Sequence, residues 1–230
     1  VFNVDNRVNA PVFGDGGSAA LVEYSADSAK VCFNIETFSE GYEAIIVPAS
    51  GQRCRVFKSP QEEEPIQTPF GHKATLSDLY MDGGAVFDFT MSRVPSNIKI
   101  LMEYAGVGEK DIDYLCLHQA NKQIIQTVGA AAGFPEEKTP WTAFENYGNN
   151  TMVSIPTVIN TTVKESMEVA NAEKTTLLCS GYGNGLAVAS CVLALDRPYL
   201  SGVKDYVKPK DFVSGAEYAE YWKRKLRGEA

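Results

Sequence analysis

The residues of this chain that could do chemistry together are a histidine, an asparagine and a glycine-rich turn. His118 directly follows the apolar run DIDYLCL and opens the stretch HQANKQII. Asn149 stands in YGNN, and the turn GYGNG (181–185) separates two apolar runs. A neutral imidazole and a carboxamide aimed at one oxygen would stabilise negative charge that develops there, and backbone amides of the turn would do so for a second oxygen. The three features therefore predict a site that polarises carbonyl groups.

Taken singly, each of these features is a weak indication. A lone histidine at a strand end is more often structural than catalytic, and GYGNG on its own could be a tight hairpin. Their shared position favours a common site, because α/β proteins place their sites at strand ends.

The elements that must position these residues are predicted from hydrophobic periodicity. Residues 85–106 are expected to be a strand entering a helix, with Pro95 in the first helical turn and Gly106 at the helix end. Residues 39–76 hold many Pro, Gly, Ser and Glu residues and predict a long, functional loop. The order of elements is that of an α/β domain with a mixed sheet between helical layers. The remaining strands are expected at 19–24, 30–38, 111–117 and in two pieces of 177–195, and the remaining helices at 119–133 and 151–169.

Composition and charge exclude several classes of function. The net charge of -8 over 230 residues argues against a nucleic-acid partner, which would need clustered Lys and Arg. The longest apolar run, residues 177–195, is broken by three glycines and an asparagine, so no membrane span is predicted. We expect a cytoplasmic protein.

The five cysteines show no spacing typical of a metal site. They are expected to be reduced structural residues. A metal site would have to pair His118 with His72, and no carboxylate spacing supports it, so none is predicted.

The C-terminal tail predicts an amphipathic helix over residues 214–229. Ser214 and Glu217 have capping-box spacing at its start. The helix has an apolar stripe on one side and basic residues on the opposite side, and we expect the stripe to pack onto the body of the chain or a partner subunit. The stripe consists of Tyr218, Tyr221, Trp222 and Leu226.

Several motifs, taken in order, resemble the C-terminal part of the β-ketoacyl-acyl-carrier-protein synthase III family, which are thiolase-fold condensing enzymes. HQAN followed by YGN is specific to these enzymes, and the matching pieces span roughly residues 12–196. The resemblance implies a layered α/β/α/β/α fold, of which this chain supplies the C-terminal half plus the last strands of the N-terminal half. The pieces are FGDGGSAAL, MDGGAVFDF, the helix after VP, DIDYLCLHQAN, YGNNTMVSIP and GYGNGLAVAS.

The resemblance also implies a decarboxylative Claisen condensation through a Cys-His-Asn triad. The cysteine would be acylated by an acyl thioester, while His118 and Asn149 hold the carbonyl of malonyl-carrier protein as it loses carbon dioxide. The second oxyanion donor would be the backbone N–H of Asn184, which is supported by Gly183 and Gly185.

Further residues take lesser roles by the same resemblance. Asn121, which closes HQAN, is expected to orient its loop by hydrogen bonds. Gly83 and Phe87 match positions that line the pantetheine tunnel, although core packing explains Phe87 equally well. Relatives often have an arginine at the position of Gln123. Lys122 beside it and the tail cluster Lys223, Arg224 and Lys225 are the candidates for carrier-protein docking.

The family's nucleophilic cysteine lies upstream of FGDG, and this chain is expected to begin after it. None of the five cysteines matches it, so a Cys-bearing N-terminal half or companion chain is expected as a partner. The other expected partners are an acyl carrier protein and a second copy of the complete enzyme in a homodimer. Thioesters of coenzyme A or phosphopantetheine would be substrates, and no cofactor is expected.

These expectations divide the chain into three parts and leave two alternatives open. Residues 1–76 would end the N-terminal thiolase half, residues 77–200 would form the C-terminal half, and residues 201–230 would be a tail with a helix. A related thiolase-fold acyltransferase would share the motifs. A non-catalytic structural subunit is the other alternative, but it would have no need of His118 and Asn149.

Overall fold

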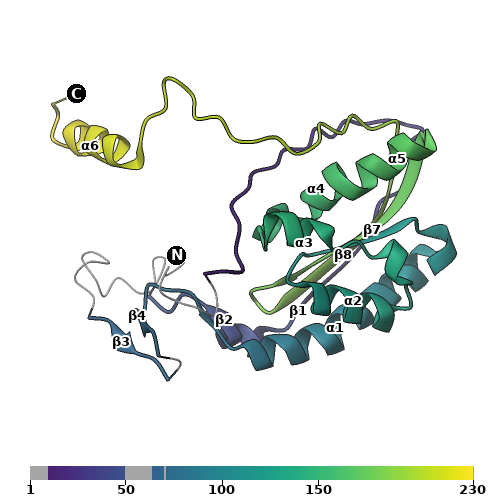
Figure 1. Cartoon of the computed structure of the whole chain (residues 1–230), viewed down its shortest axis with the longest axis horizontal. Helices are drawn as coiled ribbons and strands as arrows, with labels where there is room; N and C mark the ends of the chain where they lie inside the picture. Colours follow the sequence, from purple (N-terminus) through teal and green to yellow (C-terminus); the bar gives the residue numbers. More distant parts are fainter. Residues whose placement is uncertain (1–9, 50–63, 70, 230) are drawn as a thin grey trace.

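A four-stranded mixed sheet with the strand order β1-β8-β7-β6 forms the centre of the structure (Figure 1). The computed structural model describes residues 10–49, 64–69 and 71–229. β6 runs parallel to β7, and the other two strand pairs are antiparallel. The strands are β1 (Cys32–Thr37), β6 (Tyr114–Leu117), β7 (Lys174–Gly183) and β8 (Ala187–Asp196).

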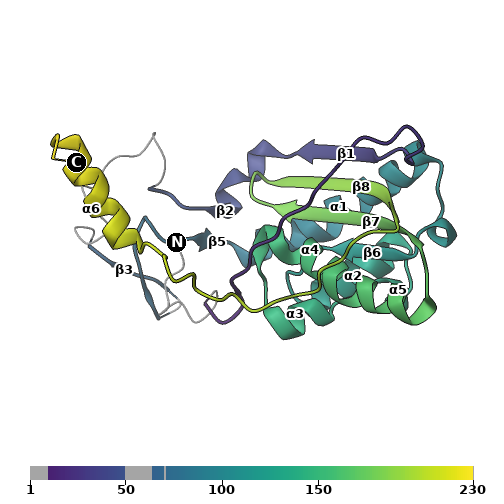
Figure 2. The same cartoon turned by 90° about the horizontal axis from the view of Figure 1, so that it is seen from above.

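Helices cover both faces of the sheet (Figures 1 and 2). On one face, α1 (Gly83–Ala105) and α2 (Lys122–Ala132) bury a core that includes Leu115, Leu178 and Val192. On the other face, α4 (Ser154–Val158) and α5 (Lys164–Ala170) bury a second core around Cys116, Leu177 and Cys179. The predicted α/β class with a mixed sheet between helical layers is confirmed.

The prediction of a strand before the first long helix is wrong. α1 is helical from Gly83, because the Asp82 side chain accepts hydrogen bonds from the N–H groups of Gly84 and Ala85 at 3.0 Å each. Pro95 therefore lies inside the helix rather than in its first turn. Gly106 ends the helix in the left-handed conformation, as predicted, with φ of 68°.

The predicted strand at 19–24 is also absent. These residues lie outside the regular elements, and they pair with no strand in the described part of the chain. Their apolar side chains are open to solvent, and Leu21 is 98% exposed. A strand needs a neighbour to satisfy its backbone, and this segment has none within the described residues.

The strand predicted at 30–38 is confirmed as β1, and its apolar side chains alternate as expected. Asn34 and Glu36 point toward α1, where both bond with Asn97. Phe33 and Ile35 point to the opposite face and are 59% and 70% exposed. β1 is the edge strand of the sheet, and the helical layer of α4 and α5 does not cover the apolar side chains on this face of β1.

The segment predicted as a long loop contains several short elements. β2 (Ile45–Ile46) pairs with β5 (Tyr80–Met81), and β3 (Ile66–Gln67) pairs with β4 (Lys73–Ala74). A short 3-10 helix, η1 (Ser39–Ala44), precedes them. Residues 50–63 of this segment lie outside the described residues.

The remaining helix predictions are confirmed with changes at their ends. α2 begins after Asn121, and the helix predicted at 151–169 comprises η5 (Thr151–Val153), α4, a π turn η6 (Ile159–Val163) and α5. The short helix α3 (Thr142–Tyr147) was not predicted, because WTAFENY has too few turns to show helical periodicity.

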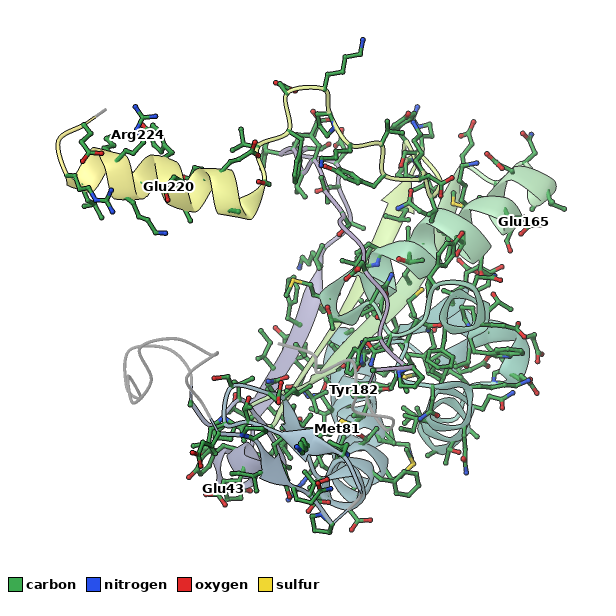
Figure 3. All side chains as sticks on the ribbon, turned by 60° about the vertical axis from the view of Figure 1, so that its left-hand side comes forward. Glu43, Met81, Glu165, Tyr182, Glu220 and Arg224 are labelled. Carbon is green, nitrogen blue, oxygen red and sulfur yellow. The ribbon has the colours of Figure 1, made fainter. Side chains whose placement is uncertain are left out.

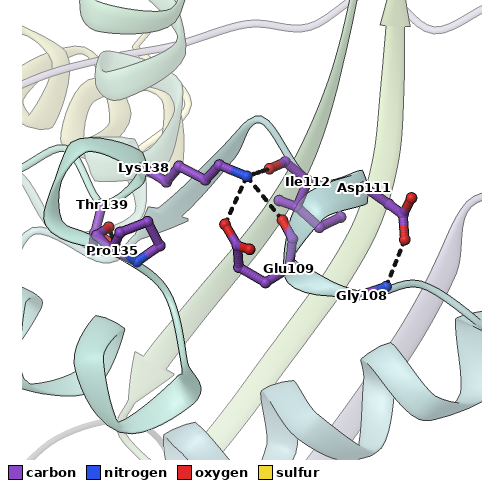
Figure 4. A network of polar contacts seen from close by, with 7 residues as sticks. All are labelled: Gly108, Glu109, Asp111, Ile112, Pro135, Lys138 and Thr139. Carbon is purple, nitrogen blue, oxygen red and sulfur yellow. Dashed lines mark hydrogen bonds and ion pairs between the residues drawn. The ribbon is translucent and has the colours of Figure 1, made fainter.

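Lys138 fixes the connection between α2 and α3 to the start of β6 (Figure 4). Its ammonium group donates to the backbone oxygens of Glu109 and Ile112 at 2.9 and 2.8 Å. It also pairs with the Glu109 carboxylate at 2.7 Å. Since Ile112 leads into β6, this cation ties the α2–α3 connection to the strand that ends at the histidine.

The tail helix is confirmed as α6 (Gly215–Leu226), with the predicted capping box between Ser214 and Glu217. Of the two expected packing partners, the body of the chain is wrong, because every residue of α6 is exposed, and a partner subunit stays a prediction. Figures 1 and 2 show α6 apart from the sheet and its helices. No helix in the described ranges is long and apolar enough to cross a membrane.

Candidate active site

His118 lies where β6 ends beside β7. Its backbone N–H donates to the Ser180 carbonyl at 2.9 Å, which continues the parallel pairing by one residue. The Tyr182 ring meets the imidazole edge-on with centroids 5.4 Å apart. The Tyr182 hydroxyl donates to the His118 carbonyl at 3.3 Å. The GYGNG segment therefore supports the histidine from one side.

Asn149 is held through its backbone by the segment that contains FGDG. Its N–H donates to the Val12 carbonyl at 2.8 Å, and its carbonyl accepts from the Gly14 N–H at 3.0 Å. A Cβ at Gly14 would lie 2.0 Å from the Tyr147 carbonyl oxygen. Gly148 has φ of 67°, and a Cβ there would lie 2.9 Å from the Val12 oxygen. Only glycines allow the two segments this close an approach.

Thr151 connects the two candidate catalytic residues. Its N–H donates to the Asn149 Oδ1 at 3.0 Å, and its backbone also receives a hydrogen bond from the His118 ring. Thr151 adopts φ of 52°, a left-handed conformation that costs a β-branched residue of order 1–3 kcal/mol. His118 and Asn149, which are 31 residues apart in the sequence, thus contact one shared residue. The role of Thr151 was not predicted, because no sequence signal marks a threonine with positive φ.

Burial keeps the imidazole neutral. Desolvation lowers the pKa of His118 from 6.5 to about 4, and the hydrogen bond with the Thr151 backbone opposes that shift. At neutral pH the ring is therefore uncharged. The Asn149 side chain is also buried, and its amide nitrogen makes no hydrogen bond within the described part of the chain.

Gln119, the second residue of HQAN, is a further positioning residue that sequence reasoning missed. It is fully buried, and its amide nitrogen donates to the carbonyls of Leu117 and Pro140 at 3.0 and 3.2 Å. Its amide oxygen accepts from the Phe144 N–H at 3.0 Å. The side chain thereby joins the end of β6 to α3, the helix that leads to Asn149.

The GYGNG turn lies next to His118 in the sheet and is fixed from the other side by Phe38. Gly183 ends β7, and Gly185 has φ of 137°. Leu186 exchanges two backbone hydrogen bonds with Phe38, at 2.7 and 3.1 Å. The Asn184 side chain is exposed.

The other predicted site residues are placed as follows. Asn121 caps α2, and its side chain accepts from the Ile124 N–H at 2.8 Å. Lys122 is exposed, and its Nζ lies 3.5 Å from the centre of the Trp141 ring. Gly83 and Phe87 occupy the exposed start of α1. Phe87 is 41% exposed, so it does not belong to the core of the described residues, and both interpretations of this residue stay predictions.

Three cysteines lie side by side on neighbouring strands of the sheet, and their environment does not suit a nucleophile. Cys116 pairs in register with Cys179, and Cys179 with Cys191. The hydrogen bond with Cys116, with burial, raises the pKa of the Cys179 thiol, and the hydrogen bond with Cys179 raises that of Cys191. Such thiols stay protonated and unreactive. Cys32 is a free, half-buried cysteine on β1, and Cys54 lies outside the described residues.

A metal site finds no support in the geometry. No group of three or more metal-binding side chains occurs among the described residues. His72 belongs to the β3–β4 hairpin and contacts Thr68, and that hairpin lies apart from the sheet that carries His118 (Figure 1).

Comparison with known proteins identifies the family. Residues 102–195 match the family model "3-Oxoacyl-[acyl-carrier-protein (ACP)] synthase III C terminal". A β-ketoacyl-[acyl-carrier-protein] synthase III of Streptococcus pyogenes is 31% identical over 197 residues, which are 84% of this chain and 55% of that protein. The fold and site therefore define a thiolase-fold protein. Within that class, the chain belongs to the β-ketoacyl-acyl-carrier-protein synthase III family and corresponds to the C-terminal region of its members.

Solved structures agree with this assignment. A crystal structure of a 3-oxoacyl-(acyl-carrier-protein) synthase III has a TM-score of 0.68 and 25% identity, over 84% of this chain and 56% of that one. The corresponding synthase from Burkholderia xenovorans LB400 has a TM-score of 0.63 and 29% identity, over 76% of this chain and 46% of that one. The chain thus spans about half the length of the relatives that it matches.

We expect His118 to titrate far below an ordinary histidine. Its pKa of about 4 lies below the unfolded value of 6.5, so the unfolded chain takes up this proton first as the pH falls. The free energy of unfolding should therefore fall between about pH 6.5 and pH 4, and the fall should be smaller in His118→Gln. NMR titration, with the two histidine signals assigned by His72→Asn, measures the pKa directly. A midpoint near 6.5 for His118 would contradict the buried environment.

Gln119→Leu should remove the connection between the end of β6, which carries His118, and α3, which leads to Asn149, and should lower the stability of the fold. The variant leaves the carbonyls of Leu117 and Pro140 without their buried partner, which should destabilise the fold by about 1–3 kcal/mol per unpaired group, while the Phe144 N–H keeps its bond to the Trp141 carbonyl. Thermal unfolding measures that loss. Gln126→Leu is the control, because Gln126 bonds only the Glu136 side chain at the surface. Equal stability of the two variants would show that Gln119 is not a positioning residue.

Proposed function

We propose that this chain is the C-terminal portion of a 3-oxoacyl-[acyl-carrier-protein] synthase III-like enzyme. The enzyme condenses an acyl thioester with malonyl-carrier protein, with loss of carbon dioxide. His118 and Asn149 hold the malonyl thioester oxygen, while a cysteine outside this chain carries the acyl group. The Asn184 backbone N–H, set by Gly183 and Gly185, serves the second oxyanion.

The observation that supports this role best is the shared contact of His118 and Asn149 with Thr151. Loss of carbon dioxide from the malonyl group leaves an enolate whose negative charge gathers on the thioester oxygen. The Asn149 Oδ1 is already bonded to Thr151, so the amide turns its free N–H₂ group away from that bond. A fixed donor of this kind contributes roughly 3 kcal/mol to stabilising such an oxygen.

The role of His118 depends on which ring nitrogen carries the hydrogen. The neutral ring has one N–H and one acceptor nitrogen. The N–H is the group that donates to the enolate oxygen.

The uncovered face of β1 supports a companion for this chain. Phe33 and Ile35 form an exposed apolar surface at the sheet edge, and the extended segment 19–24 adds three apolar side chains without a strand partner in the described residues. A soluble protein rarely leaves such surface open. A Cys-bearing N-terminal half, on the same or a separate polypeptide, would cover it.

Substrate and partner follow from the same proposal. The acyl donor is a thioester of coenzyme A or phosphopantetheine, whose arm would pass Gly83 and the exposed ring of Phe87. An acyl carrier protein would meet the start of α2, where Lys122 is held over Trp141. The complete enzyme would form a homodimer in the cytoplasm and need no cofactor.

Two other functions remain as alternatives. A thiolase-fold acyltransferase that transfers the acyl group to an alcohol or amine could use the same His118 and Asn149. A structural subunit would need neither residue, and the two bonds by which Gln119 joins the β6 end to Pro140 and to Phe144 of α3 would then have no function at the site.

The activity test is release of carbon dioxide from malonyl-carrier protein by the complete enzyme. His118→Ala and Asn149→Ala should each lower the rate by about 10²–10³-fold, because each removes one group at the developing oxyanion. His72→Ala, on the β3–β4 hairpin, is the matched control and should leave the rate unchanged. Unchanged release in both site variants would rule out the proposed chemistry.

The companion is tested by assembly. When the Cys-bearing half is supplied as a separate polypeptide, Ile35→Asp should reduce the fraction of this chain that co-elutes with it in size-exclusion chromatography. The charge would be buried at the proposed contact, which is costly. Tyr104→Asp is the control, because Tyr104 is an equally exposed residue of α1, the helix that covers the opposite face of the sheet from Ile35. Co-elution at the same level for both variants would show that the β1 face is not the contact.

A further inference from the structure

The C-terminal tail carries a helix, α6, that does not pack against the rest of the described chain. Residues 197–230 follow β8, and the family match ends at residue 195. α6 lies at the end of this tail, and none of its described residues is buried. Figure 3 shows α6 with Glu220 and Arg224 projecting from it, far from Tyr182 in the sheet. Its exposed face therefore has no function in the fold as described.

That face is an aromatic cluster with a cation in it. The rings of Tyr218, Tyr221 and Trp222 lie within 5.7 to 6.4 Å of one another, measured between centroids. Lys225 Nζ lies 5.6 Å from the Tyr221 ring and 5.0 Å from the Trp222 ring. Tyr and Trp side chains are typical of the energetically important centre of protein interfaces.

Charge divides the tail from the rest of the chain. The tail holds eight Lys or Arg residues and five Asp or Glu residues, whereas residues 1–196 hold 13 and 24. Four of the eight basic residues fall within five positions at the end of α6, namely Lys223, Arg224, Lys225 and Arg227. An acidic partner would be repelled by the body and attracted by this cluster.

We propose that α6 is the docking element for an acidic carrier protein that delivers the malonyl thioester. The proposal rests on the proposed function, and it names the surface by which the partner of that site is captured. The aromatic cluster of α6 would pack against apolar side chains of the carrier. Its basic cluster would pair with carboxylates around them.

The position of α6 fits such a capture. The connecting residues 197–214 could span about 60 Å if fully extended, so a carrier held by α6 can still present its arm to the site. Tethering raises the local concentration of the carrier without any contact at the active site. The captured carrier would then meet Lys122 at the start of α2, whose Nζ lies 3.5 Å from the centre of the Trp141 ring.

A protein partner suits this helix better than a lipid surface. An interfacial membrane helix carries mainly Lys and Arg on its polar face. On α6 that face also holds Glu217 and Glu220, and the 12-residue helix offers one leucine beside its three aromatic rings. Vesicle binding is therefore an outcome that would count against the proposal.

The experiment measures binding of a fluorescently labelled holo-acyl carrier protein to the complete enzyme by anisotropy. Charge reversal at Lys223, Arg224 and Lys225 should raise Kd by about tenfold at low salt, and the difference should shrink as salt is added. Trp222→Ala should weaken binding at all salt concentrations, because it removes apolar contact. The control is the same charge reversal at the exposed residues Lys30, Lys99 and Lys110, which lie outside the tail.

Two results would overturn the docking role. One is equal carrier affinity for the wild type, the tail variants and the control. The other is that the wild type binds vesicles of phosphatidylcholine and phosphatidylglycerol, and that the tail variants lose this vesicle binding but keep the affinity of the wild type for the carrier. Because binding is measured without turnover, a failure of His118 and Asn149 to affect carbon dioxide release would reject the chemistry and leave the docking result intact.

Discussion

The hydrogen bond between the Thr151 N–H and the Asn149 Oδ1 is the interaction on which the candidate site depends. It orients the carboxamide, and the same threonine backbone meets the imidazole of His118. Thr151 takes a left-handed conformation that a β-branched residue avoids. Strain of this kind persists where the surroundings over-determine the backbone, and here both sides of the threonine are fixed.

The surroundings consist mainly of backbone contacts made possible by small residues. Gly14 and Gly148 let the N-terminal segment bond to the Asn149 backbone on both sides. Gln119 joins the end of β6 to α3, and Lys138 joins the α2–α3 connection to the residue that leads into β6. The loops that carry the site are thus fixed at several points by buried or partly buried polar groups. Such groups are costly to leave unpaired, so these contacts define one loop arrangement.

Much of the fold could be predicted from the sequence, because long periodic segments show their structure locally. β6, β7, β8 and α2 follow from apolar periodicity, and α6 follows from its capping box and stripe. The start of α1 could not be predicted, since GGAVFDF is apolar enough for a strand and only the Asp82 cap makes it helical. The segment 19–24 has a strand sequence, yet a strand is defined by its neighbour, and no pattern within one segment supplies that. At the site, His118 and Asn149 could be found from motifs, whereas Thr151 and Gln119 act through backbone geometry and burial that the sequence does not display.

The pairing of β1 with β8 has a consequence for how the chain folds. Cys32 faces Val192, so the sheet edge closes only when residues about 160 positions apart meet. Contacts of such sequence separation form slowly, because the entropy of closing the loop is lost before the contact stabilises anything. During synthesis, β1 emerges long before the strand that it needs, and its backbone N–H and C=O groups that pair with β8 are available to other chains until then. The α1–α2 layer with β6 can form from local contacts first, and β1 adds to the sheet last, as the final step of a folding order set by topology.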